Sequence, residues 1–420
     1  MKASLISIGD ELLIGQVVNT NAAKIGEMLN LAGVKVVYTS VVQDERQSII
    51  EALEEAGKKA NLVIITGGLG PTKDDITKKV LCEFFNDTLI INQNVLDEIT
   101  TYFKKKGKEI TELNKKQAEV PTQCEVIKNP NGTAPGMWFN FKGITYVSIP
   151  GVPYEALAMM ENYILPRIKK ENELPVIFHY TIHTQGIGES YLANLIEDWE
   201  DSLGKENIKL AYLPSPGVVR LRLSGFGHEL NMVKSNVLRK KEELLPLIKE
   251  YVYGYEEFGS KPPMIHQLLG EELLRKNRKI ALAESCTGGY VSHLLTSIPG
   301  ASAYFNGCIV PYQNEFKRNL LGVDEKIFND HGAVSEECVK SMAKGILNQY
   351  KSDYAIAISG IAGPTGGTSE KPVGTVWIAW ANKEDIITEK FVFTNDRNRN
   401  IQLSAINAMG KMRKLITNGF

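Results

Sequence analysis

The sequence predicts an α/β protein of three domains, in which two larger domains of alternating strands and helices flank a small α+β module. Short, fully apolar runs typical of buried strands alternate with stretches of helical spacing in both the first and the last third of the chain. Two polar segments rich in proline, near residues 169–175 and 259–263, interrupt this alternation. We therefore predict domains at residues 1–170, 171–258 and 259–420.

The composition excludes several classes of protein. The chain has 420 residues, a formal net charge of −1 and 23% charged residues, so it has no general attraction to nucleic acid or to anionic membranes. Its N-terminus runs directly into a strand pattern, and no apolar run approaches the length of a membrane span. We therefore expect a cytoplasmic protein that binds neither membranes nor nucleic acid.

The cysteines give no sign of a metal or disulfide framework. They are five in number, an odd count, and no two have CxxC spacing. This pattern predicts reduced thiols and no structural zinc. The five are Cys82, Cys124, Cys286, Cys308 and Cys338.

The first domain begins with a regular alternation of strand and helix. This alternation predicts a parallel, doubly wound sheet, in which ligands bind where the strands end. The expected strands are Ala3–Ile8, Val34–Val42, Leu62–Ile65 and Ile144–Ile149, and the expected helices are Asn21–Leu31, a helix through Ile49, Leu53 and Ala56, and Tyr154–Ile164.

A glycine-rich run, T-G-G-L-G-P-T-K-D-D-I-T, follows the third strand at residues 66–77. Its glycines let backbone amides approach an anion closely, and two threonines add hydroxyl donors. The expected anion-binding residues are Thr66, Gly67, Gly68, Gly70 and Thr72. A Gly-Pro turn with aspartate N-caps is the alternative. The run is not a Walker loop, because GxxxxGK[ST] is absent.

Carboxylates are expected to meet at the same sheet edge. Asp74 and Asp75 close the glycine-rich run, while Asp10 and Asp44 follow two other strands. Beside a phosphate cradle, such carboxylates suit a hard divalent cation that bridges phosphate oxygens. The convergence of acids from separate strands favours a nucleotide or phosphate site over an ordinary turn.

Five segments of this domain resemble the molybdopterin-binding fold family, in the branch found at the front of CinA proteins. They are S-I-G-D-E-L-L-I-G at 7–15, N-T-N-A at 19–22, the run at 66–77, N-G-T-A-P-G at 131–136 and P-G-V-P-Y-E at 150–155. The resemblance implies that Asp44 and Asp75 are functional acids. It also implies cleavage of ADP-ribose to AMP and ribose 5-phosphate with Mg, Mn, Co or Ni, where the metal would lower the pKa of an attacking water. From the residues alone, 131–136 is an ordinary hairpin turn or a second ligand-facing loop.

The middle module predicts strand, helix, hairpin and long helix, an order that resembles a small KH-like module of the kind CinA proteins carry. The expected elements are Val176–Thr184, Glu189–Trp199, Lys209–Leu213 with Val218–Leu223, and Leu230–Val252. Residues 174–258 hold 12 Asp and Glu against 9 Lys and Arg, and the G-I-G-E loop has an acid where a nucleic-acid reader needs a cation. We interpret the module as an assembly spacer, with His179 and His183 as ordinary strand residues.

The last domain is organised around K-I-A-L-A-E-S-C-T-G-G-Y, residues 279–290. A strand that turns sharply into a helix presents its turn residues at the sheet edge, where helix amides favour negative charge. Ser285 is the first candidate nucleophile, with Cys286 as the chemical rival. Thr287, Gly288 and Gly289 would hold substrate, although Ser and Thr are also common helix caps.

A nucleophilic serine needs a base, and no histidine sits in a suitable motif. Lys317 is the better candidate, because burial lowers the pKa of a lysine toward neutrality, and Tyr312 could relay the proton. The residues alone also allow the two to be an ordinary surface pair. The loop at 359–368 offers amides and hydroxyls for a phosphate, to which an arginine could add a clamp. Its expected contributors are Ser359, Gly360, Gly363, Arg397 and Arg399.

This domain resembles the CinA carboxy-terminal domain, also known as the nicotinamide mononucleotide deamidase family. The shared motifs are A-E-S-C-T-G-G, Y-x-x-x-x-K, G-A-V-S, G-I-A-G-P and K-P-V-G-T-V. The resemblance implies hydrolysis of nicotinamide mononucleotide to nicotinic acid mononucleotide and ammonia without a cofactor, with Ser285 as nucleophile and Tyr312 and Lys317 activating it. Two positions depart from the family pattern. Ser359 stands where the family usually has Thr, and the family's second arginine, after the one that matches Arg397, falls near Ile401 in this chain.

The sequence hypothesis is therefore a bifunctional enzyme of pyridine-nucleotide salvage, expected as a homodimer. Its partners would be nicotinamide mononucleotide and ADP-ribose. One alternative is a first domain that binds a pterin. The other is a competence-related scaffold, which the neutral charge and the acidic middle module disfavour.

Overall fold

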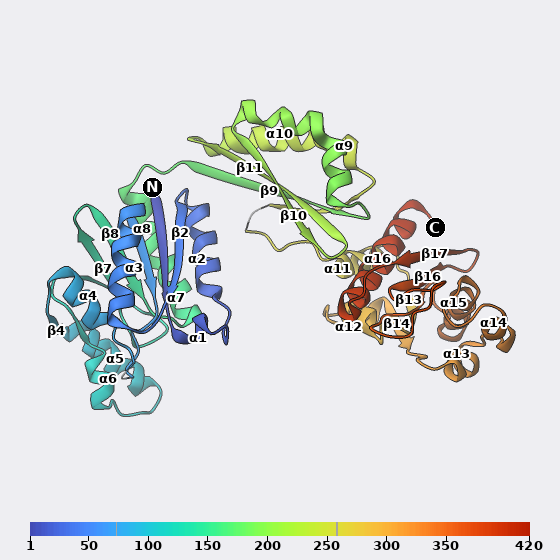
Figure 1. Cartoon of the computed structure of the whole chain (residues 1–420), viewed down its shortest axis with the longest axis horizontal. Helices are drawn as coiled ribbons and strands as arrows, with labels where there is room; N and C mark the ends of the chain where they lie inside the picture. The colour runs from blue at the N-terminus through green and yellow to red at the C-terminus, as the bar shows by residue number, and fades with distance from the viewer. Residues whose placement is uncertain (73, 258) are drawn as a thin grey trace. The chain divides into compact units, whose positions relative to one another are not determined.

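A computed structural model describes residues 1–72, 74–257 and 259–420. Lys73, inside the glycine-rich run, and Phe258, the predicted end of the middle module, lie outside the described residues. The chain divides into two compact units, Met1–Phe178 with Gly225–Ser235, and His179–Ser224 with Asn236–Phe420. Figure 1 shows the element order along the chain.

The first domain is built on a six-stranded sheet with the order β2-β1-β3-β8-β7-β6. Its first four strands are parallel, as predicted, while β7 is antiparallel to β8 and β6 is antiparallel to β7. A separate pair, β4 and β5, completes the strands of this domain. The strands are β1 (Lys2–Ile8), β2 (Lys35–Val42), β3 (Leu62–Thr66), β4 (Leu89–Ile91), β5 (Glu119–Pro121), β6 (Glu125–Ile127), β7 (Gly136–Phe141) and β8 (Ile144–Ile149).

Helices cover both faces of this sheet, which explains its fully apolar strands. Leu5 packs in a core with α2 and α7, while its neighbour Ile6 packs in a second core with α3 and α4, because successive strand residues face opposite ways. The helices are α1 (Asp10–Leu13), α2 (Thr20–Leu31), α3 (Arg46–Lys59), α4 (Thr77–Phe85), α5 (Gln93–Lys105), α6 (Glu112–Lys116), α7 (Pro153–Met159), the π-helical turn η1 (Met160–Ile164) and α8 (Leu165–Glu171).

The predicted linker at residues 169–175 needs a correction at its start. The helix expected over Tyr154–Ile164 continues through η1 into α8 and ends at Glu171, so Lys169–Glu171 form a helical turn and not the start of a linker. Pro166 follows the π-helical turn η1, and such a turn accommodates the missing amide donor of a proline inside a helix. The charged residues that suggested a linker therefore belong to an amphipathic helix, with Ile168 buried beneath them.

The middle module is a four-stranded sheet with the order β10-β11-β9-β12 and two long helices. The predicted helix over Leu230–Val252 is wrong at its end, because the helix stops at Ile248 and Val252–Glu257 pairs antiparallel with β9. Val252, Tyr253 and Tyr255 are residue types enriched in strands. The elements are β9 (Val176–Gln185), α9 (Glu189–Asp201), the 3-10 turn η2 (Leu203–Glu206), β10 (Ile208–Ser215), β11 (Val218–Gly227), α10 (Leu230–Ile248) and β12 (Val252–Glu257).

The last domain is a five-stranded sheet with the order β14-β13-β15-β16-β17, of which the first three strands are parallel and the last two antiparallel. Its helices are α11 (Ile265–Arg275), α12 (Tyr290–Thr296), α13 (Asn314–Leu321), α14 (Glu325–Asp330), α15 (Glu336–Tyr350) and α16 (Arg397–Asn418), with the 3-10 turn η3 (Ala301–Ala303). Its strands are β13 (Ile280–Glu284), β14 (Phe305–Ile309), β15 (Tyr354–Gly360), β16 (Thr375–Ala381) and β17 (Ile386–Val392).

The two faces of this last sheet carry side chains of different size. One face presents bulky residues, among them Ile356 and Trp380, to α11, α12 and α16. The other face presents mostly alanine from its three central strands to α15, with Trp377 of β16 at its margin, which lets that helix lie close to the sheet. These alanines are Ala281, Ala283, Ala355, Ala357, Ala379 and Ala381. Within the described ranges, no helix is both long enough and apolar enough to cross a membrane.

The close packing of α15 predicts that Gly345→Ala destabilises the protein. A methyl group there would lie 2.0 Å from the carbonyl oxygen of Leu321, which is backbone and cannot rotate away. We expect a loss of about 1–3 kcal/mol in the free energy of unfolding, measured in urea. Gly26→Ala in α2 is the matched control, since its nearest neighbour lies 3.9 Å away, and we expect it to be neutral or stabilising by about 0.5–1 kcal/mol. Equal effects of the two substitutions would contradict this explanation.

Candidate active sites

Parallel pairing gathers three loops at one edge of the last sheet. β13 lies between β14 and β15, with Ala283 opposite Ile309 and Glu284 opposite Ile358. The amide of Ser285 donates to the carbonyl of Ile358 at 2.9 Å, so the ladder continues one residue beyond the strand. The turn that holds Ser285 therefore meets the loops that follow β14 and β15, as the sequence predicts for the carboxyl ends of parallel strands.

A buried carboxylate fixes the helix after this turn. Glu284, which is 1% exposed, accepts hydrogen bonds from the amides of Val291 and Ser292 at 2.9 and 2.8 Å and from the Ser292 hydroxyl at 2.6 Å. Gly288 and Gly289 take positive φ angles of 61° and 95°, which glycine adopts without strain. The carboxylate thus supplies the N-terminal cap of α12, and the predicted Ser or Thr cap is not what holds this helix.

The turn residues are buried, and their chemistry differs. Burial raises the pKa of the Cys286 thiol to about 12, so the thiolate needed for attack is disfavoured and Ser285 is the better nucleophile. The Thr287 hydroxyl is buried and has no hydrogen-bond partner among the described residues. An orphaned buried hydroxyl beside a nucleophile indicates a group that awaits a ligand.

Lys317 lies on α13 with its side chain directed into the protein and only 2% of its surface exposed. Burial lowers the pKa of its ammonium below the ordinary value, partly offset by the thiols of Cys338 and Cys286. Lys317 in turn acts on the pKa of Cys286, so the amine lies close to the turn that carries Ser285. The alternative of a surface pair is therefore wrong for Lys317.

Tyr312 is 57% exposed and joins the site through an arginine. Arg397 donates to the Tyr312 hydroxyl at 2.7 Å and to the carbonyl of Gly363 at 2.8 Å. One guanidinium therefore connects the loop after β14, the loop after β15 and the start of α16. Arg399 lies two residues further along that helix, about 200° around its axis, and lines a different hollow with Pro214 and Asn398. Its predicted place beside Arg397 is not supported.

The loop after β15 is fixed by contacts with neighbouring segments of the last domain. Ser359 is buried and donates to the carbonyl of Ala333 at 2.7 Å, so its hydroxyl is engaged by the protein itself. Gly360 packs against β16, where an added Cβ would lie 2.7 Å from Val376. Asn400, which sequence reasoning missed, donates to the carbonyls of Ala362 and Thr394 at 3.0 and 2.8 Å. A buried asparagine within a helix carries no local pattern that could have revealed this role.

The glycine-rich run of the first domain is packed tightly against its neighbours. An added Cβ on Gly67 would lie 2.2 Å from the carbonyl of Ile8, and one on Gly68 would lie 2.0 Å from the Thr77 hydroxyl. Thr66 is buried, and its hydroxyl donates to Ser7 on the neighbouring strand β1 at 3.4 Å. The amides of Gly70 and Thr72, at 2.8 and 2.9 Å, and the Thr72 hydroxyl donate to the Asp75 carboxylate.

Carboxylates from three loops meet beside this run. Burial raises the pKa of Asp44, and the charges of Asp10, Glu11 and Asp75 raise it further, while a backbone bond from Asp10 opposes the rise. Asp74 is exposed at the far side of the turn. No set of three or more His, Cys, Asp or Glu side chains stands ready to hold a metal ion within the described ranges. A mutually repelling pair such as Asp44 and Asp75 still fits a cation that takes its remaining ligands from phosphate and water.

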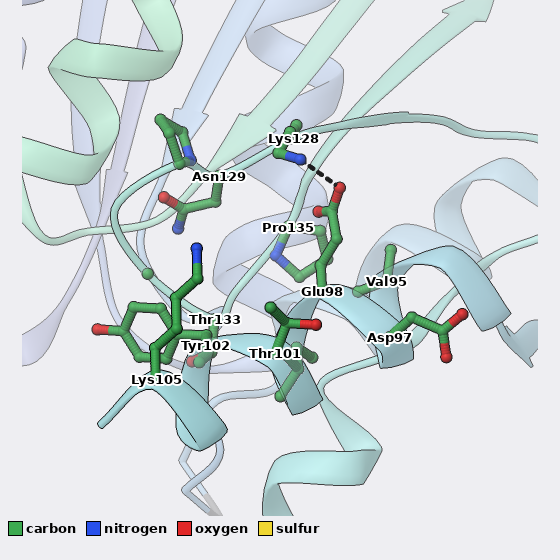
Figure 2. Close-up of a pocket in the computed structure, with 13 residues that line it drawn as sticks. Val95, Asp97, Glu98, Thr101, Tyr102, Lys105, Lys128, Asn129, Thr133 and Pro135 are labelled. Atoms are coloured by element: carbon green, nitrogen blue, oxygen red, sulfur yellow. Dashed lines mark hydrogen bonds and ion pairs between the residues drawn. The ribbon is translucent and has the colours of Figure 1, made fainter. Parts of the chain in front are cut away.

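The loop at 131–136 lies over the start of α7. Asn129 donates to the carbonyl of Ala134 at 2.9 Å and to the carboxylate of Glu155 at 2.7 Å. A cavity of about 470 Å³ lies between this loop and α5, and Lys128 pairs with Glu98 at 2.7 Å in its wall. Figure 2 shows this pair and the side chain of Lys105 directed toward the loop. The loop therefore borders a hollow, which favours the ligand-facing interpretation over an ordinary hairpin turn.

Sequence reasoning also missed Lys78. Burial lowers the pKa of its ammonium to about 8, and it donates to the carbonyls of Gln117 and Glu119 at 2.7 and 3.0 Å. The lysine anchors the segment between α6 and β5 to the helix that follows the glycine-rich run. No spacing rule could have indicated it.

Comparison with known proteins places these sites in a family. The profile of the probable molybdopterin binding domain matches residues 4–170, that of the damage-inducible protein CinA KH domain residues 179–254, and that of the CinA C-terminal domain residues 263–416. A CinA-like protein of Cytophaga hutchinsonii is 43% identical over 98% of this chain and 97% of its own. The chain belongs to the CinA family.

Further CinA proteins are similar to all or to part of this chain. A putative competence-damage inducible protein of Halothermothrix orenii is 40% identical over 97% of both chains. The solved structure of the protein CinA with unknown function from Thermoplasma acidophilum is 37% identical, covers 40% of this chain and 97% of its own, and has a TM-score of 0.37. The three domain profiles therefore occur in one CinA chain, in the order that the sequence motifs predict.

The Glu284 cap gives a testable prediction. Glu284→Ala leaves two backbone amides and the Ser292 hydroxyl without their acceptor, and we expect a loss of about 2–4 kcal/mol in the free energy of unfolding. Glu325→Ala is the matched control, since this carboxylate is 59% exposed and pairs with Arg318 at the surface of the same domain, and we expect about 0–1 kcal/mol. Equal losses in urea unfolding would contradict a special role for the cap.

Proposed function

We propose that the last domain hydrolyses nicotinamide mononucleotide to nicotinic acid mononucleotide and ammonia. The observation that carries this proposal is the buried amine of Lys317, with its lowered pKa, beside the turn of Ser285. A lysine whose neutral form is favoured by burial, near a hydroxyl before a helix N-terminus, is an arrangement suited to acyl transfer without a metal. The resemblance of the motifs supplies the substrate.

The chemistry would proceed in two halves. The Ser285 oxygen attacks the amide carbon while the neutral Lys317 amine accepts its proton. The tetrahedral intermediate then expels ammonia, which takes a proton from the Lys317 ammonium, and leaves an ester on Ser285. Water, deprotonated by Lys317, attacks that ester and releases the carboxylate and the serine hydroxyl. The Thr287 hydroxyl would stabilise the oxyanion, because the first amides of α12 already donate to Glu284 and to carbonyls of the turn.

Arg397 would contribute recognition of the nucleotide. A guanidinium binds phosphate with two donors, and Arg397 stands between the Tyr312 hydroxyl and the loop that contains Gly363. Tyr312 would act through this contact, by orienting the arginine or by relaying the proton. The same residue therefore connects substrate binding to the tyrosine.

Lys317 provides the sharpest test of the deamidase. We expect Ser285→Ala and Lys317→Met to lower ammonia release about a thousandfold or more, and Cys286→Ala to change it little. Because only the neutral amine accepts a proton, the wild-type rate should rise with pH up to the lowered pKa of Lys317 and then level off. Lys317→Arg keeps the charge but cannot lose its proton, so it should remain inactive. Activity of Lys317→Arg near the wild-type rate would overturn the assignment.

We further propose that the first domain cleaves ADP-ribose to AMP and ribose 5-phosphate with a divalent metal, such as Mg, Mn, Co or Ni. Asp44 and Asp75 would hold the ion, with Asp10 at the same edge. When bound, the metal supplies charge neutralisation of the pyrophosphate and a more acidic water. The amides of Gly70 and Thr72 donate to Asp75 and that of Gly67 donates to Ile149, so other amides of the glycine-rich run would bind phosphate oxygens. This proposal rests on the carboxylates that surround Asp44.

For this activity we expect AMP formation from ADP-ribose to vanish with a chelator and to fall about a hundredfold or more in Asp44→Asn. Glu112→Gln in the same domain is the control, because this carboxylate is 84% exposed on α6, and we expect wild-type rates. Liquid chromatography of the products measures both. AMP formation that persists with the chelator and in Asp44→Asn would remove the metal from the proposal.

A pterin remains the second candidate ligand of the first domain, because the matching profile is that of a probable molybdopterin binding domain. Thermal shifts with ADP-ribose and with molybdopterin separate the two. A shift with ADP-ribose alone supports the pyrophosphatase, and a shift with the pterin alone replaces it.

A further inference from the structure

A second cavity, of about 460 Å³, lies in the unit that contains the last domain, away from the turn of Ser285. It has four walls: strands of the middle module, the segment that begins α11, helix α12 and helix α16. The lining residues are His183, Ser215, Pro216, Val218, Arg220, Tyr253, Pro262, Pro263, Met264, Ile265, His266, Tyr290, Leu294, Gln402, Ile406 and Met409. Its volume is in the range of pockets that bind small molecules.

The chemistry of the lining selects the kind of molecule. Most of the wall is apolar or aromatic, which suits a planar ring. Arg220 is the one permanent cation among the lining residues, and these residues include no carboxylate. His183 is engaged by Tyr253 at 3.3 Å and by Glu256 at 2.9 Å, and burial lowers the pKa of His266. The only fixed charge of the wall is therefore positive.

Arg220 is also incompletely paired by the protein. Its Nε is buried without a hydrogen-bond partner, and no ion pair joins it to an acid within the described ranges. A buried guanidinium nitrogen without an acceptor costs free energy unless a ligand supplies one. Carboxylates and phosphates are the acceptors that match the guanidinium fork.

Two walls of the cavity are helices that begin at the candidate active site. Tyr290 and Leu294 lie one turn apart on α12, which starts directly after the turn of Ser285. Gln402, Ile406 and Met409 form a stripe on α16, which starts at Arg397. A molecule in the cavity would therefore contact the helices that carry the nucleophile turn and the arginine clamp.

We infer that this cavity binds a small planar molecule carrying one oxyanion, with the oxyanion on Arg220 and the ring between α12 and α16. The occupant steadies both helices and so adjusts the last domain without entering its active site. The shared chemistry is a ring with a carboxylate or a phosphate, and the two sources are separated by experiment.

Titration calorimetry of the full chain with benzoate and with phenyl phosphate tests the site, and benzyl alcohol is the neutral control. We expect one or both anions to bind the wild type and the alcohol to bind at least tenfold more weakly, about the effect of losing one charge-assisted hydrogen bond. Arg220→Met should weaken the anion about tenfold or more. Arg222→Met is the matched control, since Arg222 shares the strand and a buried, unpartnered Nε but does not line the cavity, and it should bind as the wild type does.

A second variant tests the site independently, in case Arg220→Met fails to fold. Gln402→Trp adds a ring from the exposed side of α16, fills the cavity and should abolish binding while the melting temperature stays close to that of the wild type. Absence of binding by both anions to the wild type, or wild-type binding in both Arg220→Met and Gln402→Trp, overturns the site.

Hydrogen exchange tests the connection to the active site. The anion that binds should slow exchange of the amides from Ser285 to Leu294 in the wild type and leave them unchanged in Arg220→Met. Equal exchange with and without the anion in the wild type overturns the adjustment of the active site. Neither measurement uses turnover of nicotinamide mononucleotide, so failure here is distinct from failure of the proposed deamidase.

Discussion

Parallel strand pairing is the constraint on which both candidate sites depend. In a parallel sheet every strand ends at the same edge, and the backbone bonds fix which residues meet there. The bond from the Ser285 amide to Ile358 extends that register by one residue into the turn, so the ladder itself positions the candidate nucleophile. In the first domain, the same rule brings the loops that carry Asp10, Asp44 and Asp75 to one edge.

Burial then sets the chemistry of the last domain. Lys317 and Cys286 lie in the same water-poor region, and desolvation acts on them in opposite directions. It favours the uncharged amine, which is the reactive form of lysine, and the uncharged thiol, which is the unreactive form of cysteine. The same burial therefore favours the basic form of Lys317, the candidate base, and the unreactive thiol form of Cys286, the rival nucleophile.

Much of the fold and of the sites follows from the sequence, since apolar periodicity, glycine turns and strand-end acids are local signals. The predictions fail where contacts with residues far away in the chain determine the local structure. Val252–Glu257 pairs with β9, far away in the chain, and this pairing overrides the helical pattern that precedes it. Glu284, Asn400 and Lys78 act through backbone groups of other segments, and such contacts leave no spacing in the sequence. Arg397 and Arg399 lie in the same short motif, and only their positions around the axis of α16 show which of them reaches the candidate site.

The two bonds of Arg397 have a consequence for the order of events at its guanidinium. Its Nη2 donates to the Tyr312 hydroxyl and its Nη1 to the carbonyl of Gly363. Under the proposed function, a phosphate that binds Nη2 would displace an exposed phenol. Binding of the nucleotide and release of the tyrosine would then be a single exchange, and a substrate without its phosphate would leave Tyr312 bonded to the arginine.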